Sequence, residues 1–283
     1  MNKNSRRPAV TISVRVFAPA KINLFLHVGD KRADGFHPLE SLAVFVDVGD
    51  KLSLERSDNL SLTIDGPFAE GLVGDGDNLV LKAARLINVT GRIVLTKNLP
   101  VASGIGGGSA DAAAALRALN ELWNLNRTDL AEIAAKLGSD VPVCVASKAA
   151  WMEGRGEILT PASVPALSLV LVNPRVGVST ADVFRTLKDR SGIGMRLGWE
   201  GDLLPFLRNA TNDLEEPACA IQPVIGDVLD ALETLPGVEL ARMSGSGATC
   251  FGIFEDDASA ANAARLLSVK HPGWWVRAAK VLQ

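Results

Sequence analysis

The 283-residue sequence predicts an α+β protein with two domains. Stretches with strand patterning and stretches with helix patterning are mixed without the strict strand–helix–strand order of a doubly wound sheet. A glycine-rich segment joins an alternating apolar run to an alanine-rich helix within residues 92–123. Pro161 and Pro165 then mark a linker before a solid apolar run. We therefore predict a flexible tail over residues 1–9, an N-terminal domain over 10–162 and a C-terminal domain over 163–283.

The composition excludes several classes of protein. With 47% hydrophobic and 22% charged residues, the chain has the balance of a soluble globular protein. Its net charge of −3 provides no bulk attraction to nucleic acid. The N-terminus lacks the apolar block of a signal peptide, and no run reaches transmembrane length. We expect a cytoplasmic protein with neither nucleic acid nor a membrane as partner, and the sequence leaves a monomer and a weak dimer open.

The three cysteines, Cys144, Cys219 and Cys250, lie far apart and are odd in number. No pair has the C-x-x-C or Cys–His spacing of a zinc site, and nothing indicates a disulfide framework. Each cysteine stands among apolar residues, so we predict three small core side chains.

Residues 10–17, V-T-I-S-V-R-V-F, alternate with period two, which is typical of a half-buried strand. A turn is expected at 29–38, where Asp34-Gly35 is the strongest local signal. Asp77 or Asn78 can cap a helix, and Thr128 can cap a later one that stops at Gly138. The predicted strands are 10–17, 22–28 after a break at 18–21, 39–54 in two pieces broken at 47–50, 60–64 and 92–96. The predicted helices are 79–87, 111–123 and 128–137.

The second half opens with a solid apolar run at 167–172, which predicts a buried strand. A glycine-containing loop is expected at 190–201. The predicted strands are 167–172, 239–243, 249–254 and 274–281, and the predicted helices are 180–187, 217–235 and 258–267.

Residues 100–110, P-V-A-S-G-I-G-G-G-S-A, contain four glycines in five positions, and we call them the glycine loop. Such a backbone adopts positive φ freely, and at the start of a helix it can direct bare N–H groups at an anion. The loop is not a Walker A loop, which ends in Gly-Lys-Ser/Thr, and not a dinucleotide fingerprint, because Ser109 replaces the third glycine. We predict a phosphate cradle; the alternative is a tight strand-to-helix connection without a ligand.

Two charged residues stand beside apolar runs. Lys21 lies within A-P-A-K-I-N-L-F-L, where it either reaches the surface at a strand edge or is buried and paired. Asn23 would share its strand face. Asp140 lies in a polar connector before V-P-V-C-V, where it serves either a turn or an active site. If Lys21 and Asp140 converge near a phosphate loop, the aspartate can accept a hydroxyl proton while the lysine stabilises the charge of a transferring phosphoryl group.

Two further loops carry residues suited to a ligand. In the turn at 29–38, Phe36 can stack on a ligand ring beside His37, or it can simply cover the core. The Ser-Gly-Ser-Gly segment at 244–247, which we call the second glycine segment, lies between two predicted strands. It can close against a nucleotide or merely turn the chain.

Three motifs, in this order and at these separations, resemble those of the GHMP kinase family: P-A-K-I-N at 19–23, P-x-x-x-G-I-G-G-G-S at 100–109 and S-G-S-G at 244–247. The stretches K-I-N-L-F-L-H-V, R-A-D-G-F-H-P-L, L-G-S-D-V-P-V and N-D-L-E are similar to one branch of that family, whose substrate carries a cytidine diphosphate on methylerythritol. The resemblance spans nearly the whole chain after the tail. The glycine loop alone indicates only the superfamily, whereas R-A-D-G-F-H with G-S-D-V-P-V is much more specific.

The resemblance implies an N-terminal ATP-binding α/β domain, a ferredoxin-like C-terminal domain and a site in the cleft between them. It implies transfer of the γ-phosphoryl group of ATP to the erythritol 2-hydroxyl of this small-molecule substrate, in non-mevalonate isoprenoid biosynthesis. Mg²⁺ is expected to bridge the ATP phosphates, with Ser109 as the one candidate protein ligand.

Residue roles follow from the same resemblance by matching position. Asp140 is the implied general base and Lys21 its charged partner. The implied substrate-binding residues are Asn23, Phe36, His37, Thr180 and Phe184; Phe36 would stack on the cytosine, and Thr180 and Phe184, which match more loosely, would form the other wall of its pocket. The implied ATP-binding residues are Asn78, Lys97, Pro100, Val101, Ala102, Ser103, Gly104, Ile105, Gly106, Gly107, Gly108, Ser109 and Ala110, with Asn78 and Lys97 nearer the nucleoside. The third motif adds Ser244, Gly245, Ser246 and Gly247.

The sequence departs from the family pattern at five positions. Phe36 stands where the family commonly has Tyr, so stacking survives but a hydroxyl contact is lost. Ala102 and Ser103 replace glycines, Ala110 replaces a second serine, and Ala248 stands where Pro is usual. These changes bear on loop geometry and ATP affinity rather than on the reaction class.

Two alternatives stay open. One is another GHMP kinase, such as a homoserine or mevalonate kinase, but an aromatic turn at 34–37 suits a substrate with a nucleobase. The other is a catalytically inactive member that serves as a binding or regulatory protein, against which the intact Lys21 and Asp140 argue.

Overall fold

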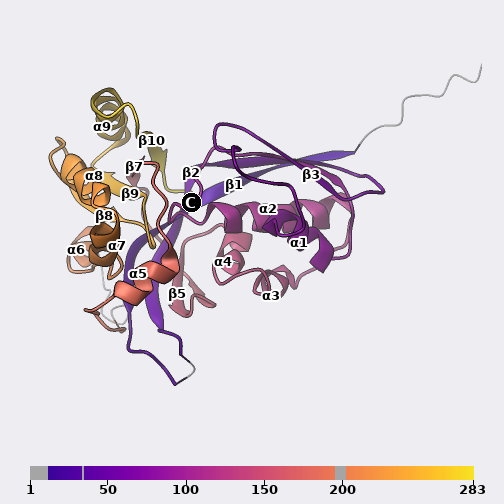
Figure 1. The fold of residues 1–283 in the computed structure, drawn as a ribbon, viewed down its shortest axis with the longest axis horizontal. Coiled ribbons are helices and arrows are strands. Elements are labelled where there is room, and N and C mark those ends of the chain that lie inside the picture. Colours follow the sequence, from indigo (N-terminus) through magenta and orange to yellow (C-terminus); the bar gives the residue numbers. More distant parts are fainter. Residues whose placement is uncertain (1–11, 34, 195–201) are drawn as a thin grey trace, which may run out of the picture.

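The computed structural model describes residues 12–33, 35–194 and 202–283, so the predicted tail, Asp34 and the end of the predicted loop at 190–201 lie outside it. The described chain forms two sheets with helices packed on them (Figure 1). The first sheet has six strands in the order β3-β4-β2-β5-β6, with β1 paired to β2, and the second has four in the order β10-β7-β9-β8. All pairs are antiparallel except β3–β4. The predicted α+β class is confirmed.

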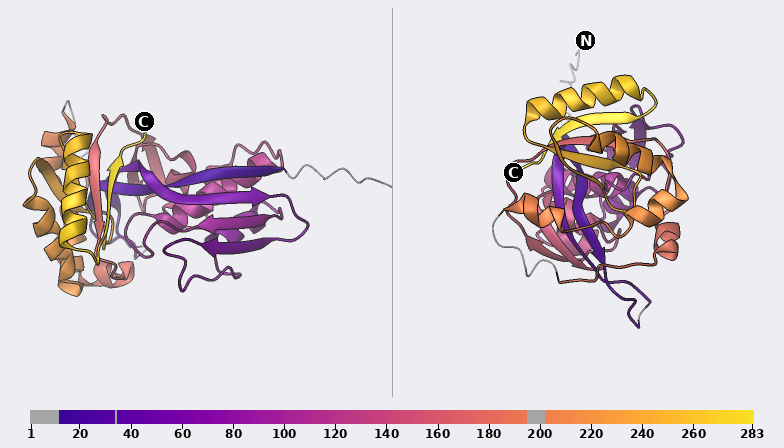
Figure 2. Two further views of the ribbon diagram at one scale, coloured as in Figure 1. Left: turned by 90° about the horizontal axis from the view of Figure 1, so that it is seen from above. Right: turned by 90° about the vertical axis from the view of Figure 1, so that its left-hand side faces the viewer.

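The first sheet is organised around one long ribbon, since β1 and β2 pair from Ser13↔Glu55 to Val28↔Leu39. Figure 2 shows this ribbon running from the first sheet into the body that holds the second. The strands of the first sheet are β1 (Ser13–Val28), β2 (Leu39–Glu55), β3 (Ser61–Asp65), β4 (Arg92–Thr96), β5 (Ala150–Gly154) and β6 (Ile158–Pro161).

The predicted breaks at 18–21 and 47–50 are both wrong. The register shifts between Pro19 and Lys21, so Pro19 lies at a bulge, where its missing N–H costs little pairing. The N–H of Lys21 instead donates to the carbonyl of Ile105 in the glycine loop, at 3.0 Å. Opposite Pro19, Gly49 allows the two strands to approach, because a Cβ there would lie 2.3 Å from the carbonyl oxygen of Ala18. The proline and glycine thus mark a bulge and not a turn.

Four helices lie on one side of the first sheet and bury an alanine-rich core against it (Figure 1). They are α1 (Leu79–Leu86), α2 (Gly107–Leu122), α3 (Leu130–Ala134) and α4 (Val141–Ala146). Asn78 caps α1 as predicted, accepting from the N–H of Val80 at 2.9 Å. Helix α2 begins four residues earlier than predicted, inside the glycine loop, because Gly106 takes a left-handed φ of 65° just before it. The predicted Thr128 cap is wrong, since Asp129 holds the N-cap position of α3 without a side-chain bond.

The second sheet is buried on both faces, which explains the solid apolar run in β7. Leu169 and Leu171 face the core shared with the β1–β2 ribbon, while Val170 and Val172 face the core under the helices. The strands are β7 (Ser168–Asn173), β8 (Val238–Met243), β9 (Cys250–Phe254) and β10 (Trp275–Lys280). The helices are α5 (Thr180–Thr186), α6 (Leu203–Arg208), α7 (Glu215–Ile221), α8 (Val224–Glu233) and α9 (Asp257–Lys270).

Two helix predictions in this half need correction. The helix predicted over 217–235 is two helices, α7 and α8, because Pro223 between them has no N–H to continue the first. Helix α6 was not predicted. The remaining predicted elements are present with end shifts of up to three residues.

Isolated bridges from Leu26 to Asn212 and from Val46 to Val281 join the ribbon to the second half of the chain. The boundary predicted between residues 162 and 163 falls in the stretch between β6 and β7, and the division into domains there stays a prediction. Within the described residues, no helix has both the length and the apolar character needed to cross a membrane.

Candidate active site

A cavity of about 1080 Å³ opens where the ribbon, the glycine loop and the second half of the chain meet. All but three of the predicted site residues line it, so the structure brings together segments more than 200 positions apart, from Lys21 to Gly247.

The three exceptions, Ile105, Ala110 and Ser244, are buried and do not line the cavity. Their polar groups hold the wall together instead. The carbonyl of Ile105 accepts from Lys21, and the Ala110 N–H closes the first turn of α2. The Ser244 hydroxyl accepts from the N–H of Asn23 at 3.0 Å and donates to the Gly104 carbonyl at 3.1 Å.

Lys21 and Asp140 form an ion pair at the cavity wall, with 2.8 Å between Nζ and Oδ2. The lysine side chain is only 4% exposed while that of the aspartate is 38% exposed, which rules out the alternative of a lysine at the surface. The bulge at Pro19 places Lys21 on β1 beside the glycine loop. Asp140 holds the N-cap position of α4 without capping it, so its carboxylate is available to Lys21 and to the cavity.

Asn23 lines the cavity with Lys21, as their shared strand face predicted. Its Nδ2 donates to the Ser41 hydroxyl at 2.7 Å. Its Oδ1 is buried and has no hydrogen-bond partner within the described part of the chain. A buried acceptor without a partner is costly, so a ligand that donates to it would be favoured.

The glycine loop and the second glycine segment meet backbone to backbone. Gly104 has a φ of 75°, and a Cβ there would lie 2.3 Å from the carbonyl oxygen of Ser244. A Cβ on Gly245 would lie 2.7 Å from the Gly104 carbonyl oxygen. Ala102, which replaces a family glycine, also has a positive φ of 49°. The loop thus needs glycine for close approach at Gly104 and tolerates strain at Ala102.

The predicted aromatic residues Phe36 and Phe184 line the cavity together with His37. The ring of Phe184 is stacked on that of His37, with 6.2 Å between their centroids. Phe36 is 51% exposed, and the Arg155 guanidinium lies 4.7 Å from its ring centroid. The Nδ1 of His37 lies 3.0 Å from the carbonyl oxygen of Gly29, which suits a proton on Nδ1 and leaves Nε2 as an acceptor.

Thr180, the last predicted wall residue, bonds to the second glycine segment, with 2.8 Å between its hydroxyl and that of Ser246. The first turn of α5 is therefore linked directly to this segment.

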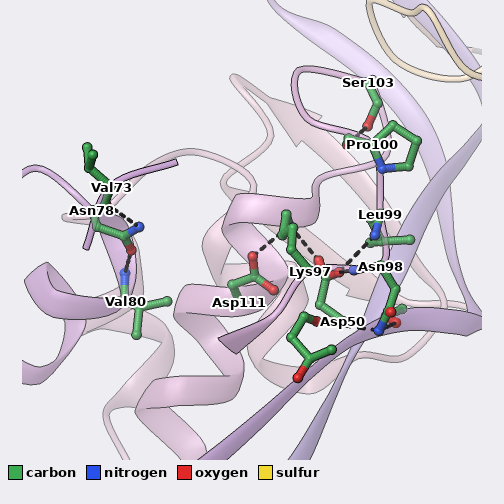
Figure 3. A network of polar contacts seen from close by, with 12 residues as sticks. Asp50, Val73, Asn78, Val80, Lys97, Asn98, Leu99, Pro100, Ser103 and Asp111 are labelled. Carbon is green, nitrogen blue, oxygen red and sulfur yellow. Dashed lines mark hydrogen bonds and ion pairs between the residues drawn. The ribbon is translucent and has the colours of Figure 1, made fainter. Parts of the chain in front are cut away.

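Lys97 lines the cavity, but its ammonium is held by two buried carboxylates (Figure 3). Its Nζ lies 2.5 Å from Asp50 Oδ2 and 2.8 Å from Asp111 Oδ2. Burial alone would lower the pKa of Lys97, but the attraction of Asp111 and Asp50 outweighs it and the net shift is upward. That Lys97 lies near the nucleoside of ATP stays a prediction, and the charge of its ammonium is already compensated by the two carboxylates.

Asp50 and Asp111 were not predicted as site residues. Burial raises the pKa of Asp111 to about 7, although Lys97 opposes the shift. The second oxygen of Asp111, Oδ1, is buried without a hydrogen-bond partner among the described residues. In the sequence, Asp50 follows Gly49 and looks like a turn residue, while Asp111 looks like the first residue of a helix, so neither gives a local signal.

The cysteines take no part in the site. Cys144 and Cys250 are buried and Cys219 is partly buried, and all three are free thiols. Burial raises the pKa of the Cys144 thiol to about 12, with Asp140 adding to the shift. This thiol is therefore protonated at neutral pH and is not a nucleophile.

Magnesium is compatible with the oxygen groups at the cavity, although they do not form a cage. Ser109, Asp111 and Asp140 line the cavity and offer hard oxygen donors. The described residues contain no group of three His, Cys, Asp or Glu side chains that could hold a metal ion. This arrangement suits Mg²⁺ carried mainly by phosphate oxygens, with one or two protein ligands.

Comparison with protein families gives matches in both halves of the chain. Residues 78–148 match the GHMP kinases N terminal domain, which includes the glycine loop and Asp140. Residues 195–268 match the GHMP kinases C terminal domain, which includes the second glycine segment.

The chain is also similar to individual proteins along nearly its whole length. It is 52% identical over 281 residues to the 4-diphosphocytidyl-2-C-methyl-D-erythritol kinase of Ruegeria pomeroyi, covering 96% of this chain and 100% of the relative. A crystal structure of a 4-(cytidine 5'-diphospho)-2C-methyl-D-erythritol kinase matches with a TM-score of 0.77 at 31% identity, covering 95% of this chain and 100% of the other. A homoserine kinase from Cytophaga hutchinsonii matches with a TM-score of 0.74 at 21% identity, covering 98% of each chain, and shares the fold.

Proposed function

The chain belongs to the GHMP kinase family, and we propose that it uses ATP to phosphorylate 4-diphosphocytidyl-2-C-methyl-D-erythritol on the 2-hydroxyl of the erythritol. The reaction is a phosphoryl transfer to an alcohol in non-mevalonate isoprenoid biosynthesis. The observation that carries the proposal is the Lys21–Asp140 pair in the wall of a cavity that the glycine loop also lines. The names of relatives at about half identity support the choice of substrate.

Asp140 is the general base. Its side chain is partly exposed to the cavity, so a substrate hydroxyl can reach the carboxylate. As the hydroxyl oxygen attacks the γ-phosphorus, its proton passes to Asp140, the bond from the γ-phosphorus to the bridging oxygen breaks, and ADP leaves.

Lys21 is the charge partner. Its ammonium lies 2.8 Å from Asp140, orients that carboxylate and stabilises the negative charge that gathers on the transferring group. Because the lysine is buried, this charge is fixed in place before the reactants arrive. Mg²⁺ bound to the ATP phosphates, with Ser109 as our candidate ligand, would neutralise further charge.

The two ends of the cavity suit the two reactants. The glycine loop leads into α2 and holds the ATP phosphates at the helix N-terminus, with Asn78 nearer the nucleoside. At the other end, Phe36, His37, Phe184 and Thr180 provide ring faces and polar atoms for a cytosine. Asn23 lies beside Lys21, where its free Oδ1 can accept from the substrate.

The test is ADP release by the purified protein with ATP, Mg²⁺ and one acceptor at a time. We expect turnover with 4-diphosphocytidyl-2-C-methyl-D-erythritol and none with homoserine or mevalonate. Turnover favouring either of the other acceptors would overturn the substrate assignment. ATP binding without ADP release on any acceptor would favour the inactive binding protein instead. NMR of the product would show which hydroxyl carries the new phosphate. A phosphate on any hydroxyl other than the 2-hydroxyl would contradict the proposed position of transfer.

A further inference from the structure

Three charged side chains from three different elements meet in the protein interior beneath the glycine loop (Figure 3). Asp50 comes from β2, Lys97 from the segment after β4, and Asp111 from α2; we call them the buried charge cluster. Their side chains are 0%, 5% and 4% exposed. Lys97 and Asp111 reach the cavity wall, Asp50 does not line it, and the proton transfer proposed above uses none of the three.

Stability alone does not account for charges at this place. Burying ions costs desolvation energy, and well-packed apolar residues of similar volume are often equally or more stabilising. Charged groups instead add geometric specificity, because their hydrogen bonds fix the distance and angle between the elements that carry them. The cluster is therefore better explained by the relative position that it gives to the segments carrying its three residues.

The geometry that it sets is that of the glycine loop. Asp50 Oδ1 accepts from the backbone N–H groups of Asn98 at 2.5 Å and Leu99 at 2.9 Å, the two residues just before the loop. Asp111 lies in α2 just after the loop. Lys97 bonds to both carboxylates, so it ties the entrance of the loop to its exit.

The cluster also lies beside a part of the loop that lines the cavity. A Cβ built on Gly107, the first residue of α2, would lie 3.0 Å from the ammonium of Lys97 and 3.7 Å from Asp50 Oδ2. On the next residue back, a Cβ on Gly106 would lie 3.4 Å from Cβ of Lys21. A movement of Lys97 or Asp50 toward Gly107 would therefore press on the first residue of α2, and the residue before it, Gly106, lies beside Lys21.

We propose that Asp50, Lys97 and Asp111 are positioning residues that hold the glycine loop in the conformation that binds ATP. The inference rests on the proposed function only in taking ATP as the ligand of the loop. None of the three needs to touch ATP through its charged group. Their loss should weaken ATP binding while leaving the cytidine end of the cavity unchanged.

The first test compares Lys97→Met with the matched surface variant Lys82→Met, whose lysine is 43% exposed and pairs with Asp77 on the surface. Dissociation constants for ATP and for the cytidine substrate are measured separately by calorimetry. We expect Lys97→Met to raise the Kd for ATP at least about tenfold, because a displaced binding group loses its contacts. The Kd for the cytidine substrate and both constants of Lys82→Met should match the wild type.

A second variant separates positioning from stability, because Lys97→Met leaves two buried carboxylates uncompensated and can unfold the protein. The triple variant Asp50→Asn, Lys97→Met, Asp111→Leu removes every charge and keeps an acceptor for the N–H groups of Asn98 and Leu99. We expect its thermal midpoint to recover toward that of the wild type while its Kd for ATP stays raised. Wild-type ATP affinity in either variant would overturn the inference. If the wild type itself failed to bind ATP, the proposed function would fail instead.

Discussion

At the scale of single residues, Phe36 is the side chain whose effect on binding of the cytidine substrate can best be measured separately from ATP binding. Its ring is half exposed in the cavity, and the Arg155 guanidinium covers part of it at 4.7 Å. A cation over an aromatic ring contributes about 0.5–1 kcal/mol at an exposed site, enough to bias the ring toward one orientation. Arg155, which also lines the cavity, is a residue that the sequence did not indicate as part of the site.

We expect Phe36→Ala to raise the KM for the cytidine substrate while the Kd for ATP stays unchanged. Stacking on one base is worth about 1–3 kcal/mol, which corresponds to a rise of about 5- to 150-fold. The measurement is steady-state kinetics with each reactant varied in turn. Ile158→Ala is a suitable control, because Ile158 is similarly exposed but does not line the cavity. An equal loss for both reactants would indicate damage to the fold rather than a lost stacking contact.

Sequence reasoning reached Lys21 because it lies within an apolar strand region and Asp140 because its connector precedes an apolar run, and the motif resemblance implied the role of each. Their meeting, across 119 positions, required the fold. Sequence reasoning did not identify Asp50 or Asp111 as site residues. A carboxylate after a glycine is usual in a turn, and a carboxylate at the start of a helix is usual in its first turn. Sequence reasoning placed Lys97 near the nucleoside, and only the tertiary contacts show that two carboxylates already hold the ammonium.

At the scale of elements, the glycine loop depends on the contact between Gly104 and the second glycine segment. We expect Gly104→Ala to destabilise the protein by about 1–3 kcal/mol or more, because its φ is 75° and its Cβ would lie 2.3 Å from the Ser244 carbonyl oxygen. ATP affinity should fall as well. Urea unfolding and ATP titration measure the two effects.

The control for this prediction is Gly177→Ala. A Cβ on Gly177 meets no atom within 4 Å, and Gly177 does not have a positive φ. Its stability should remain within about 0.5–1 kcal/mol of the wild type. If the two variants were equally stable, the close approach of the two loops would not be a constraint on the fold.

Elements with a single, sustained pattern were predictable, as β4 and α1 show. Elements whose local signal has two explanations were not. Pro19 and Gly49 read as strand breaks, but they form a bulge and a close contact within one ribbon. Sequence alone cannot make this distinction, because a bulge depends on the partner strand.

At the scale of the whole molecule, the cavity is composed of residues from both halves of the chain. The glycine loop and Asp140 come from the first half, while Thr180, Phe184 and the second glycine segment come from the second. The periodicity of apolar residues predicts which residues are buried, but not which distant segments of the chain meet. The prediction that these segments form one site therefore came from the motif resemblance. The bridges between the ribbon and the second half show how the fold brings these parts together.

The central claim is that Asp140 accepts the proton during phosphoryl transfer, and Asp140→Asn tests it most directly. The amide has the same shape and can still bond to Lys21, so the site should keep its geometry. The measurement is single-turnover transfer from bound ATP to the cytidine substrate, together with the Kd for ATP. We expect the rate to fall by about 10²–10⁴-fold, with the Kd for ATP within about twofold of the wild type. Transfer at the wild-type rate would show that another group is the base.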